Sequence, residues 1–418
     1  MAEKSNDNQS FKVAIVGSGP SAFYAAQALF KADQDIAVDM LEKLPTPFGL
    51  LRGGVAPDHQ QMKTISKAYE KIASHDQFRF FGNVTVGKDI TFNTLKDHYH
   101  AVIIAIGAET DRKLNIDGED ATGSYTATEF VAWYNGHPDY QTRNFDLSGK
   151  HAVVIGQGNV AVDVTRILAK PIEALQTTDI TQNAIEALKE SKIEHIYMVG
   201  RRGPAQAAFT ELELKELGNI PDVNLEIHDN LELSEADQEE IETSSKARKN
   251  CALLKQQKEA GLPYESPKKT IHILFYRSPN KINVSDTNHV TSILCDINQL
   301  SGQAGAQKAR ATGETQDVPA DILFRSIGYK GVGLEGVPFN EQKGVIPNNQ
   351  GQVVDADGNN VPNTFVTGWI KRGPSGVIGT NRSDSIETVA SCLSTLDAAE
   401  QKNTTDIEQT LTEQKIGR

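Results

Sequence analysis

Two glycine-rich segments of this chain carry the residues with the most specific chemistry. The first reads Gly17-Ser18-Gly19-Pro20-Ser21-Ala22, and the second reads Gly156-Gln157-Gly158-Asn159-Val160-Ala161. Each follows an apolar run typical of a strand and precedes a segment typical of a helix. The first glycine permits a tight turn, the second lets the backbone approach a phosphate, and the helix directs its N-terminal amides at the anion. The sequence therefore predicts two dinucleotide sites.

The two predicted sites differ at the end of the strand that follows each turn. The apolar run 36–41 ends at Glu42, whose carboxylate would accept hydrogen bonds from ribose hydroxyls. The run 193–199 ends instead in Gly200-Arg201-Arg202-Gly203. Arginine suits a 2′-phosphate, which a carboxylate would repel, so the second site is predicted to prefer NADP over NAD. The alternative is that Arg201 and Arg202 only form a solvated face.

A loop rich in proline and glycine, residues 43–59, follows the first strand–helix–strand unit and is predicted to contain no regular element. We expect it to face inward over a cofactor, because it is more apolar than a surface connection needs to be. His59 ends the loop and could exchange a proton near neutral pH, although a single histidine is more often a satisfied polar residue. The large apolar residues of the loop are Phe48, Leu50, Leu51 and Val55.

The composition argues against several classes of protein. A chain of 418 residues exceeds what one hydrophobic core usually supports, which predicts two or three domains. Its net charge of -13 disfavours a nucleic-acid partner. Cys251, Cys295 and Cys392 are isolated in the sequence, which argues against disulfide frameworks, zinc sites and protein-bound iron–sulfur clusters and suits a reducing cytosol.

Neither the N-terminus nor the apolar runs indicate a membrane protein. Residues 1–10 are polar and are predicted to form a disordered lead without the apolar core of a targeting segment. Runs such as 101–108 are far too short to span a bilayer. We therefore expect a soluble, cytoplasmic protein with no membrane insertion.

Periodicity and turn residues predict the elements around these motifs. Before the second turn, we expect a helix in 60–73, an extended segment in 78–86 and a buried strand in 99–106. After it, we expect a helical insertion in 171–190, charged solvated helices in 228–260, strands in 271–277, 281–298 and 322–327, and a flexible turn in 301–313. A late strand runs into Gly368-Trp369, and Asp384 with Glu387 is similar to a capping box that would open a helix reaching Leu396.

The chain resembles the adrenodoxin-reductase-like ferredoxin–NADP reductases over nearly its whole length after residue 11. Besides the second glycine turn, three stretches carry the resemblance. These are Pro45-Thr46-Pro47-Phe48-Gly49-Leu50 through Ala56-Pro57-Asp58-His59, Gly200-Arg201-Arg202-Gly203-Pro204 through Phe209-Thr210, and Gly368-Trp369-Ile370-Lys371-Arg372-Gly373-Pro374-Ser375-Gly376-Val377-Ile378. The missing Cys-x-x-Cys agrees with this branch rather than with disulfide reductases.

The resemblance implies an α/β fold with two Rossmann-like dinucleotide-binding domains, the NADP domain being inserted into the FAD domain. The implied domains are 11–108 for the first part of the FAD domain, 109–330 for the NADP domain and 331–418 for the rest of the FAD domain. The implied FAD contacts are Ser21, Glu42, Leu50, Val86, Trp369, Gly376, Val377 and Ile378. The implied NADP(H) contacts are Gln157, Gly158, Asn159, Val160, Arg201, Arg202, Glu213 and the backbone of Gly376.

The same resemblance implies that NADPH reduces FAD, which then passes single electrons to a small acidic iron–sulfur ferredoxin. Gly376 is expected to leave nothing between the nicotinamide and the flavin, while His59 and Glu213 would relay a proton or gate the nicotinamide. Basic residues in 246–258 and Arg201 would dock the ferredoxin, and a monomer is favoured. Two alternatives stay open: an FAD/NADPH electron-input subunit of a larger complex, and a redox-sensing nucleotide-binding protein without useful turnover.

Overall fold

The computed structural model describes residues 11–396 and 406–413, and the predicted N-terminal lead lies outside them. Contacts divide these residues into two compact units, which are described separately. Unit 1 comprises residues 11–55, 60–110, 328–396 and 406–413. Unit 2 comprises Asp111–Ile327 together with the short segment Ala56–His59, whose chain neighbours on both sides belong to unit 1.

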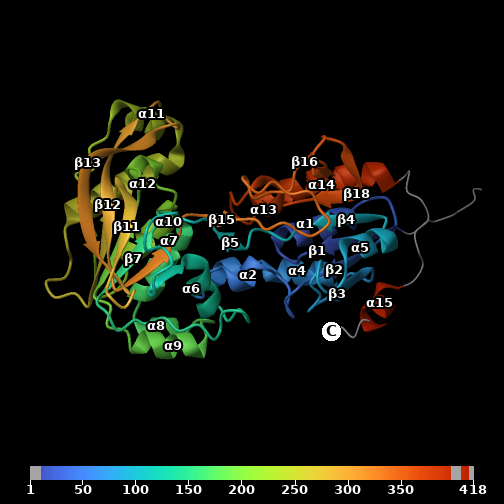
Figure 1. The fold of residues 1–418 in the computed structure, drawn as a ribbon, viewed down its shortest axis with the longest axis horizontal. Helices are drawn as coiled ribbons and strands as arrows, with labels where there is room; N and C mark the ends of the chain where they lie inside the picture. Colours follow the sequence, from blue (N-terminus) through green and yellow to red (C-terminus); the bar gives the residue numbers. More distant parts are fainter. Residues whose placement is uncertain (1–10, 397–405, 414–418) are drawn as a thin grey trace, which may run out of the picture. The chain divides into compact units, whose positions relative to one another are not determined.

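Unit 1 is built on a seven-stranded sheet in the order β16-β17-β18-β4-β1-β2-β3 (Figure 1). The five strands from β18 to β3 are parallel, whereas β16 and β17 add an antiparallel edge. The strands are β1 (Phe11–Val16), β2 (Ile36–Leu41), β3 (Phe78–Phe81), β4 (Ala101–Ile104), β16 (Asn348–Asn349), β17 (Gln352–Val354) and β18 (Asn360–Val366). A separate two-stranded sheet joins β5 (Thr110–Asp111) to β15 (Tyr329–Lys330), where the chain leaves unit 1 and returns to it.

Helices cover both faces of this sheet, as the continuous apolar composition of its parallel strands requires. Side chains of β1 alternate between two cores, with Val13 and Ile15 in one and Ala14 and Val16 in the other. The first core contains side chains of α1, α4 and α14, and the second contains those of α5, α13 and α15. The helices are α1 (Pro20–Leu29), α2 (Leu50–Gly53), α3 (Gln60–Lys63), α4 (Ser66–Ala73), α5 (Phe92–His98), α13 (Trp369–Arg372), α14 (Thr380–Leu396) and α15 (Ile407–Glu413).

Unit 2 combines a six-stranded parallel sheet, in the order β6-β14-β7-β8-β10-β9, with a three-stranded antiparallel sheet, β11-β12-β13. The parallel strands are β6 (Ser124–Thr126), β7 (His151–Ile155), β8 (His195–Val199), β9 (Val223–Ile227), β10 (Lys269–Leu274) and β14 (Ile322–Arg325). The antiparallel strands are β11 (Arg277–Val284), β12 (Val290–Ser301) and β13 (Lys308–Pro319). The helices are α6 (Ala127–Tyr134), α7 (Asn159–Ala169), α8 (Ile172–Leu175), α9 (Gln182–Lys189), the 3-10 turn η1 (Pro204–Gln206), α10 (Glu211–Gly218), α11 (Glu235–Thr243) and α12 (Ser245–Ala260).

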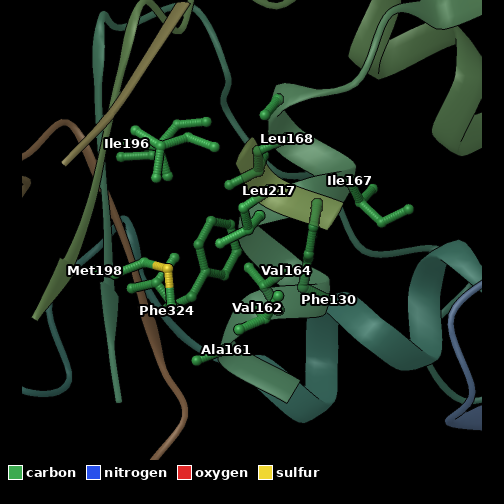
Figure 2. Close-up of a cluster of buried hydrophobic side chains, with 14 of the residues drawn as sticks. Phe130, Ala161, Val162, Val164, Ile167, Leu168, Ile196, Met198, Leu217 and Phe324 are labelled. Carbon is green, nitrogen blue, oxygen red and sulfur yellow. The ribbon is translucent and has the colours of Figure 1, made fainter. Parts of the chain in front are cut away.

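The two faces of the parallel sheet of unit 2 pack against different layers. One face carries Met198 and Phe324 toward Phe130 of α6 and Val164 of α7 (Figure 2). The other face carries a smaller apolar cluster in which Val153 and its neighbours join side chains of β11, β12 and β13. The first core fixes α7, and therefore the second glycine turn, against the sheet.

The structure corrects four predictions about local elements. The loop 43–59 contains a one-turn helix, α2, in place of wholly irregular chain. The strand expected in 281–298 is two strands, because Asn288 takes a positive φ of 58° and the chain reverses between β11 and β12. The turn expected in 301–313 is shorter, since β13 begins at Lys308. The late helix α14 begins at Thr380, so Asp384 lies inside it and does not cap it.

No helix among the residues of the described ranges is long and apolar enough to cross a membrane.

Candidate nucleotide and redox site

The first glycine of each turn is required by the protein backbone itself. Gly17 has φ +100°, and a Cβ there would lie 2.6 Å from the carbonyl oxygen of Ala105. Gly156 has φ +133°, and its Cβ would lie 2.1 Å from the carbonyl oxygen of Ser326. A side chain at either position would combine backbone strain with a steric clash. These two glycines therefore shape the turns whether or not a ligand is bound.

The second glycine of each turn has no such requirement. Gly19 and Gly158 have ordinary φ values of −74° and −99°, and no described atom lies within 4 Å of a Cβ built on either. They are the N-caps of α1 and α7, and neither helix receives a side-chain cap or carries an acidic residue in its first turn. Each turn thus leaves open space in front of free backbone amides and a positive helix end, which fits a pyrophosphate.

In unit 1, Glu42 lies beside the first turn as predicted from its spacing. Gly17 donates its amide to the carbonyl of Leu41 at 2.8 Å, which sets the turn against the end of β2. The amide and hydroxyl of Ser18 donate to Glu42 Oε2 at 3.0 and 2.6 Å, and the amide of Leu44 donates to Oε1 at 3.0 Å. These donors hold the buried carboxylate at the carboxyl edge of the sheet, where a ribose would lie.

Ser21 ties the first turn to the late part of unit 1. Its hydroxyl donates to Asn381 Oδ1 at 3.1 Å, and Ser385 donates to its carbonyl at 2.9 Å. A Cβ on Gly368, which has φ +77°, would lie 2.2 Å from Ser21 Oγ. Serine at this position therefore joins α1 to α14 through hydrogen bonds between residues far apart in the sequence.

The apolar residues predicted to lie over or contact the first ligand differ in how deeply they are buried. Phe48 and Leu51 are buried in the core that contains α1, whereas Leu50 is 37% exposed. Val86 is buried in the core on the opposite face of the sheet. Phe48 and Leu51 therefore face inward as predicted, while the partial exposure of Leu50 leaves its side chain accessible to a ligand.

In the late segment of unit 1, residues 368–378, the local backbone geometry requires a glycine at position 376. Gly376 has φ +81°, and a Cβ there would lie 2.4 Å from Thr380 Oγ1. The Trp369 indole donates to the carbonyl of Ser375 at 3.2 Å, so these two predicted contacts lie close together. Val377 is exposed and Ile378 packs against the core. Since Gly376 is required by local backbone geometry, its presence alone does not identify a ligand contact.

In unit 2, the parallel pairing of β7 and β8 places the second turn and the arginine pair at one sheet edge. Gly156 donates to the carbonyl of Val199 at 2.8 Å, directly before Gly200, Arg201 and Arg202. Both arginine side chains are exposed and make no ion pair with the described residues. They extend from the carboxyl end of β8, where they could bind a phosphate on a nucleotide held at the turn.

The other predicted residues of this turn brace its backbone. Gln157 donates its side-chain amide to the carbonyl of Leu274 at 3.2 Å, and its own carbonyl accepts the amide of Phe209 at 2.8 Å. Asn159 Oδ1 accepts the amide of Thr210 at 2.9 Å. Val160 packs against the core formed with the helices. The segment ending in Thr210 is thereby held against the second turn.

A buried charge cluster lies behind the second turn, centred on Arg166 of α7. The Arg166 side chain is 0% exposed and is bidentate to Asp58, with Nε and Nη2 at 2.7 and 3.0 Å. The same guanidinium contacts Asp163 Oδ1 at 2.6 Å and Glu213 Oε2 at 2.9 Å. Lys170 adds a contact to Asp58 at 2.6 Å. Burial opposes ionisation of Asp58, but its hydrogen bonds and the charges of Arg166 and Lys170 hold its pKa well below the usual range.

His59 lies at the margin of this cluster. Its Nε2 is 2.9 Å from Glu216 Oε2 and 3.8 Å from Glu213 Oε2, while Nδ1 is 3.8 Å from Asp163 Oδ1. Burial and the charge of Asp163 raise the pKa of Glu213 to about 7, and Arg166, which opposes this shift, is shared with three other carboxylates. The structure thus brings His59 within 3.8 Å of Glu213, a carboxyl group that can hold a proton near neutral pH.

Sequence reasoning missed most members of this cluster. Asp163 and Arg166 are separated by one helical turn within an otherwise apolar helix, which is the only local signal of a buried ion pair. Asp58 and Glu216 give no such signal, because their contacts to α7 join segments distant in the sequence.

These observations define a protein with two Rossmann-like units, each with a glycine turn that fits a dinucleotide. A family model described as pyridine nucleotide-disulphide oxidoreductase matches residues 11–199. The chain is 46% identical over 401 residues to the NADPH-ferredoxin reductase FprA of Mycobacterium tuberculosis, covering 94% of this chain and 85% of that protein. It is 41% identical to the mitochondrial NADPH:adrenodoxin oxidoreductase of Homo sapiens, covering 90% and 77%. The chain belongs to the family of NADPH-dependent ferredoxin and adrenodoxin reductases.

Solved structures agree with this membership. A mutant form of Mycobacterium tuberculosis FprA superposes with a TM-score of 0.91 at 43% identity, covering 97% of this chain and 90% of that chain. FprA in complex with NADPH gives a TM-score of 0.90 at the same identity and coverage. The predicted family and fold class are therefore confirmed.

Proposed function

We propose that this protein is a flavoprotein reductase that takes electrons from NADPH through FAD and passes them to a ferredoxin. The observation that carries this function is the pair of open, uncapped helix N-termini at Gly19 and Gly158. One such site per unit gives the protein two dinucleotide sites. Family membership supports the choice of FAD and NADPH as the nucleotides and of an iron–sulfur protein as the electron acceptor.

Unit 1 would hold FAD. The pyrophosphate would lie at Gly17 and Gly19, and Glu42, already fixed by the Ser18 donors, would accept from the ribose. When bound, the flavin supplies the conversion between two-electron and one-electron chemistry. The further FAD contacts that we propose are Ser21, Leu50, Val86, Trp369, Gly376, Val377 and Ile378.

Unit 2 would hold NADPH. The pyrophosphate would lie at Gly158 and Asn159, with Gln157 and Val160 bracing the turn. Arg201 and Arg202 are proposed to bind the 2′-phosphate, since their exposed guanidinium groups follow the strand end at which a ribose would lie. This pair would distinguish NADPH from NADH.

His59 and Glu213 are proposed to control a proton near the nicotinamide site. Their proximity and the raised pKa of Glu213 support a role in which one group holds the proton that the other releases. Arg166 would position both by fixing Asp163 and Glu213. Hydride transfer itself needs no protein acid, so we expect these groups to tune the rate rather than to be essential.

The acceptor is proposed to be an acidic ferredoxin that docks on the basic residues of α12 and on Arg201. Of these residues, Lys249 pairs with Glu211, and Lys258 donates to the carbonyl of Ile227 at 2.9 Å. Lys246 and Arg248 are exposed and are the strongest candidates. We expect Lys246→Glu with Arg248→Glu to slow ferredoxin-dependent cytochrome reduction several-fold at low salt and little at high salt. An equal effect at both salt concentrations would contradict an electrostatic interface.

The alternatives have less support. An electron-input subunit with its own iron–sulfur clusters needs cysteine ligands, and the three cysteines are isolated from one another. Burial raises the pKa of Cys295 and Cys392 to about 12, so both remain protonated thiols at neutral pH. Such reduced thiols suit a reducing cytoplasm, which we propose as the location of the protein, and we also propose that it is a monomer.

The decisive experiment is a visible spectrum of the purified protein followed by anaerobic NADPH titration. We expect a flavin spectrum that is bleached by NADPH and restored by oxidised ferredoxin. Bleaching without rapid ferricyanide or ferredoxin turnover would favour the redox-sensing alternative. A colourless protein that cannot be reconstituted with FAD would overturn the proposed function.

A further inference from the structure

A row of polar side chains, most of them histidine or tyrosine rings, crosses one face of the parallel sheet in unit 2. These side chains point to the face opposite the α7 core, because Ile196, Met198, Ile271 and Ile273 alternate with them toward that core. Register pairs His272 with Tyr197 on one side and with Glu226 on the other. The row consists of His151, His195, Tyr197, His272, Glu226 and, just after β9, His228.

Three members of this row direct ligand atoms at a common point. His272 Nδ1 is 2.9 Å from His228 Nε2 and 3.1 Å from Glu226 Oε2, and the latter two atoms are 3.6 Å apart. Zinc bound tetrahedrally by nitrogen and oxygen ligands at about 2.0–2.1 Å separates those ligands by about 3.3 Å. Each side of the observed triangle is therefore close to the separation that such an ion requires.

The three atoms, His272 Nδ1, His228 Nε2 and Glu226 Oε2, cannot all form well-directed hydrogen bonds with one another. If His272 Nδ1 carries a hydrogen, that hydrogen can point well at either Glu226 or His228, and the other contact is left poor. If Nδ1 carries a lone pair, it can accept from His228 but then lies 3.1 Å from the carboxylate oxygen, which repels it. A cation at the centre makes all three contacts favourable, since each atom then offers a lone pair.

We propose that Glu226, His228 and His272 form a binding site for a divalent transition-metal ion of the zinc type. Imidazole and carboxylate ligands suit such ions. His195 Nδ1 lies 3.0 Å from His272 Nε2, so the second ring nitrogen of this ligand has the hydrogen-bond partner that fixes its orientation.

Electrostatics distinguish this triangle from the other histidine–carboxylate group of unit 2. His59, Glu213 and Glu216 also lie close together, but Arg166 Nη1 contacts Glu213 at 2.9 Å and thus already supplies a positive charge. No lysine or arginine contacts Glu226, His228 or His272 among the described residues. The carboxylate of Glu226 therefore has no lysine or arginine partner among the described residues, and a metal ion would supply the positive charge.

The position of the site indicates what a bound ion would do. β9 is the edge strand of the sheet and pairs with β10, so an ion held by Glu226, His228 and His272 would link the two strands. The side chains of His228 and Glu226 are 34% and 39% exposed, which leaves the site open to an ion from solvent. Binding to the folded state alone would stabilise unit 2.

The test is a calorimetric titration of the full-length, FAD-loaded, chelator-treated protein with Zn²⁺. We expect one ion per chain at this site, and we expect His228→Gln and Glu226→Gln each to weaken its binding by at least about tenfold. Both residues are partly exposed, so these variants should fold. The matched controls are His75→Gln, which removes an exposed histidine elsewhere, and His59→Gln, which removes the other candidate ligand.

Thermal unfolding gives a second readout that is independent of catalysis. Zn²⁺ should raise the Tm of the wild type and of His75→Gln, but not that of His228→Gln. The proposal is overturned if wild type binds no Zn²⁺, if the His228 and Glu226 variants keep the wild-type isotherm, or if only His59→Gln loses the ion. The last outcome would locate metal binding at the proposed redox cluster and leave the reductase function intact.

Discussion

The glycine turns of unit 1 and unit 2 share one backbone design but are followed by different chemistry. In each, a positive-φ glycine is packed against a carbonyl oxygen, and a second glycine leaves open space before an uncapped helix. At the end of the next strand, unit 1 has Glu42, held by two Ser18 donors, whereas unit 2 has two exposed arginines. We therefore expect the turn to provide a general phosphate site and the end of the neighbouring strand to select the nucleotide.

The helices behind the two turns also differ. The buried face of α1 consists of three alanines, Phe23, Leu29 and Ser21, and the helix packs against α14. The corresponding helix α7 carries Asp163 and Arg166 into the interior, where they meet Asp58 and Glu213. Unit 2 therefore couples its nucleotide helix to a buried charge network that also includes His59, whereas α1 of unit 1 is held by apolar packing and neutral hydrogen bonds.

The largest effect should come from removing the centre of that network. Arg166→Met would leave Asp58, Asp163 and Glu213 buried without their shared cation, and we expect a loss of about 3–5 kcal/mol in the free energy of unfolding. Urea denaturation measures this loss. Arg248→Met, at an exposed position of α12, is the control and should change stability by less than about 0.5 kcal/mol. A similar small change in both variants would show that the buried network is not structurally important.

Alanine substitutions should separate the two glycines within each turn. Gly17→Ala and Gly156→Ala should destabilise the protein by about 2–4 kcal/mol through backbone strain and a clash with a carbonyl oxygen. Gly19→Ala and Gly158→Ala should leave the Tm of the nucleotide-free protein nearly unchanged, because their Cβ positions are empty.

Nucleotide binding provides the second half of this test. Gly19→Ala should weaken retention of FAD, and Gly158→Ala should weaken NADPH binding, each by about 2 kcal/mol because a methyl group displaces the pyrophosphate from backbone amides. Equilibrium dialysis for FAD and steady-state kinetics for NADPH measure these effects. Equal loss of both nucleotides in either variant would contradict one site per turn.

The arginine pair after β8, in place of the Glu42 carboxylate after β2, predicts that unit 2 prefers NADPH over NADH. Arg202→Ala should raise the KM for NADPH by the equivalent of about 1.5–3 kcal/mol, because a charge-assisted contact to the 2′-phosphate is lost. The KM for NADH should change little, since NADH lacks that phosphate. Ferricyanide reduction with each coenzyme measures both values, and Arg248→Ala serves as the surface control. Parallel increases for the two coenzymes would refute the phosphate contact.

The smallest effect concerns the pH dependence of stability in unit 2. Burial and Asp163 raise the pKa of Glu213 to about 7 in the folded state, above the value of about 4.3 expected in the unfolded chain. The folded state therefore holds this proton more tightly, and the resulting stabilisation is complete below about pH 4 and is lost as pH rises through about 7.

The Glu213→Gln variant isolates this contribution. Between pH 5 and 8, the wild type should lose about 1–2 kcal/mol more stability than the variant, because glutamine cannot ionise. Chemical denaturation across this range provides the measurement. Parallel stability curves for the two proteins would mean that Glu213 titrates near its unfolded value.

The features predicted correctly from sequence are those encoded by neighbouring residues. The glycine turns and the family motifs depend on short segments, and the fold class and family that they predicted are confirmed. The ligand contacts predicted for Glu42 and Arg201 stay predictions. Local composition leaves the burial of single residues undetermined. Leu50 is as apolar as Leu51, and only packing decides that Leu51 is buried while Leu50 is exposed.

By itself, the sequence determined two phosphate-binding turns, because a tight turn and close phosphate approach impose residue types at fixed spacing. Only the tertiary structure decided that Asp58 contacts Arg166 and that the side chains of Glu226, His228 and His272 converge. It also decided that position 376 must be a glycine, because a Cβ there would clash with Thr380. The physical reason is that charge burial and ligand convergence depend on distances between segments that are remote in the chain. Side-chain periodicity within one segment carries no information about those distances.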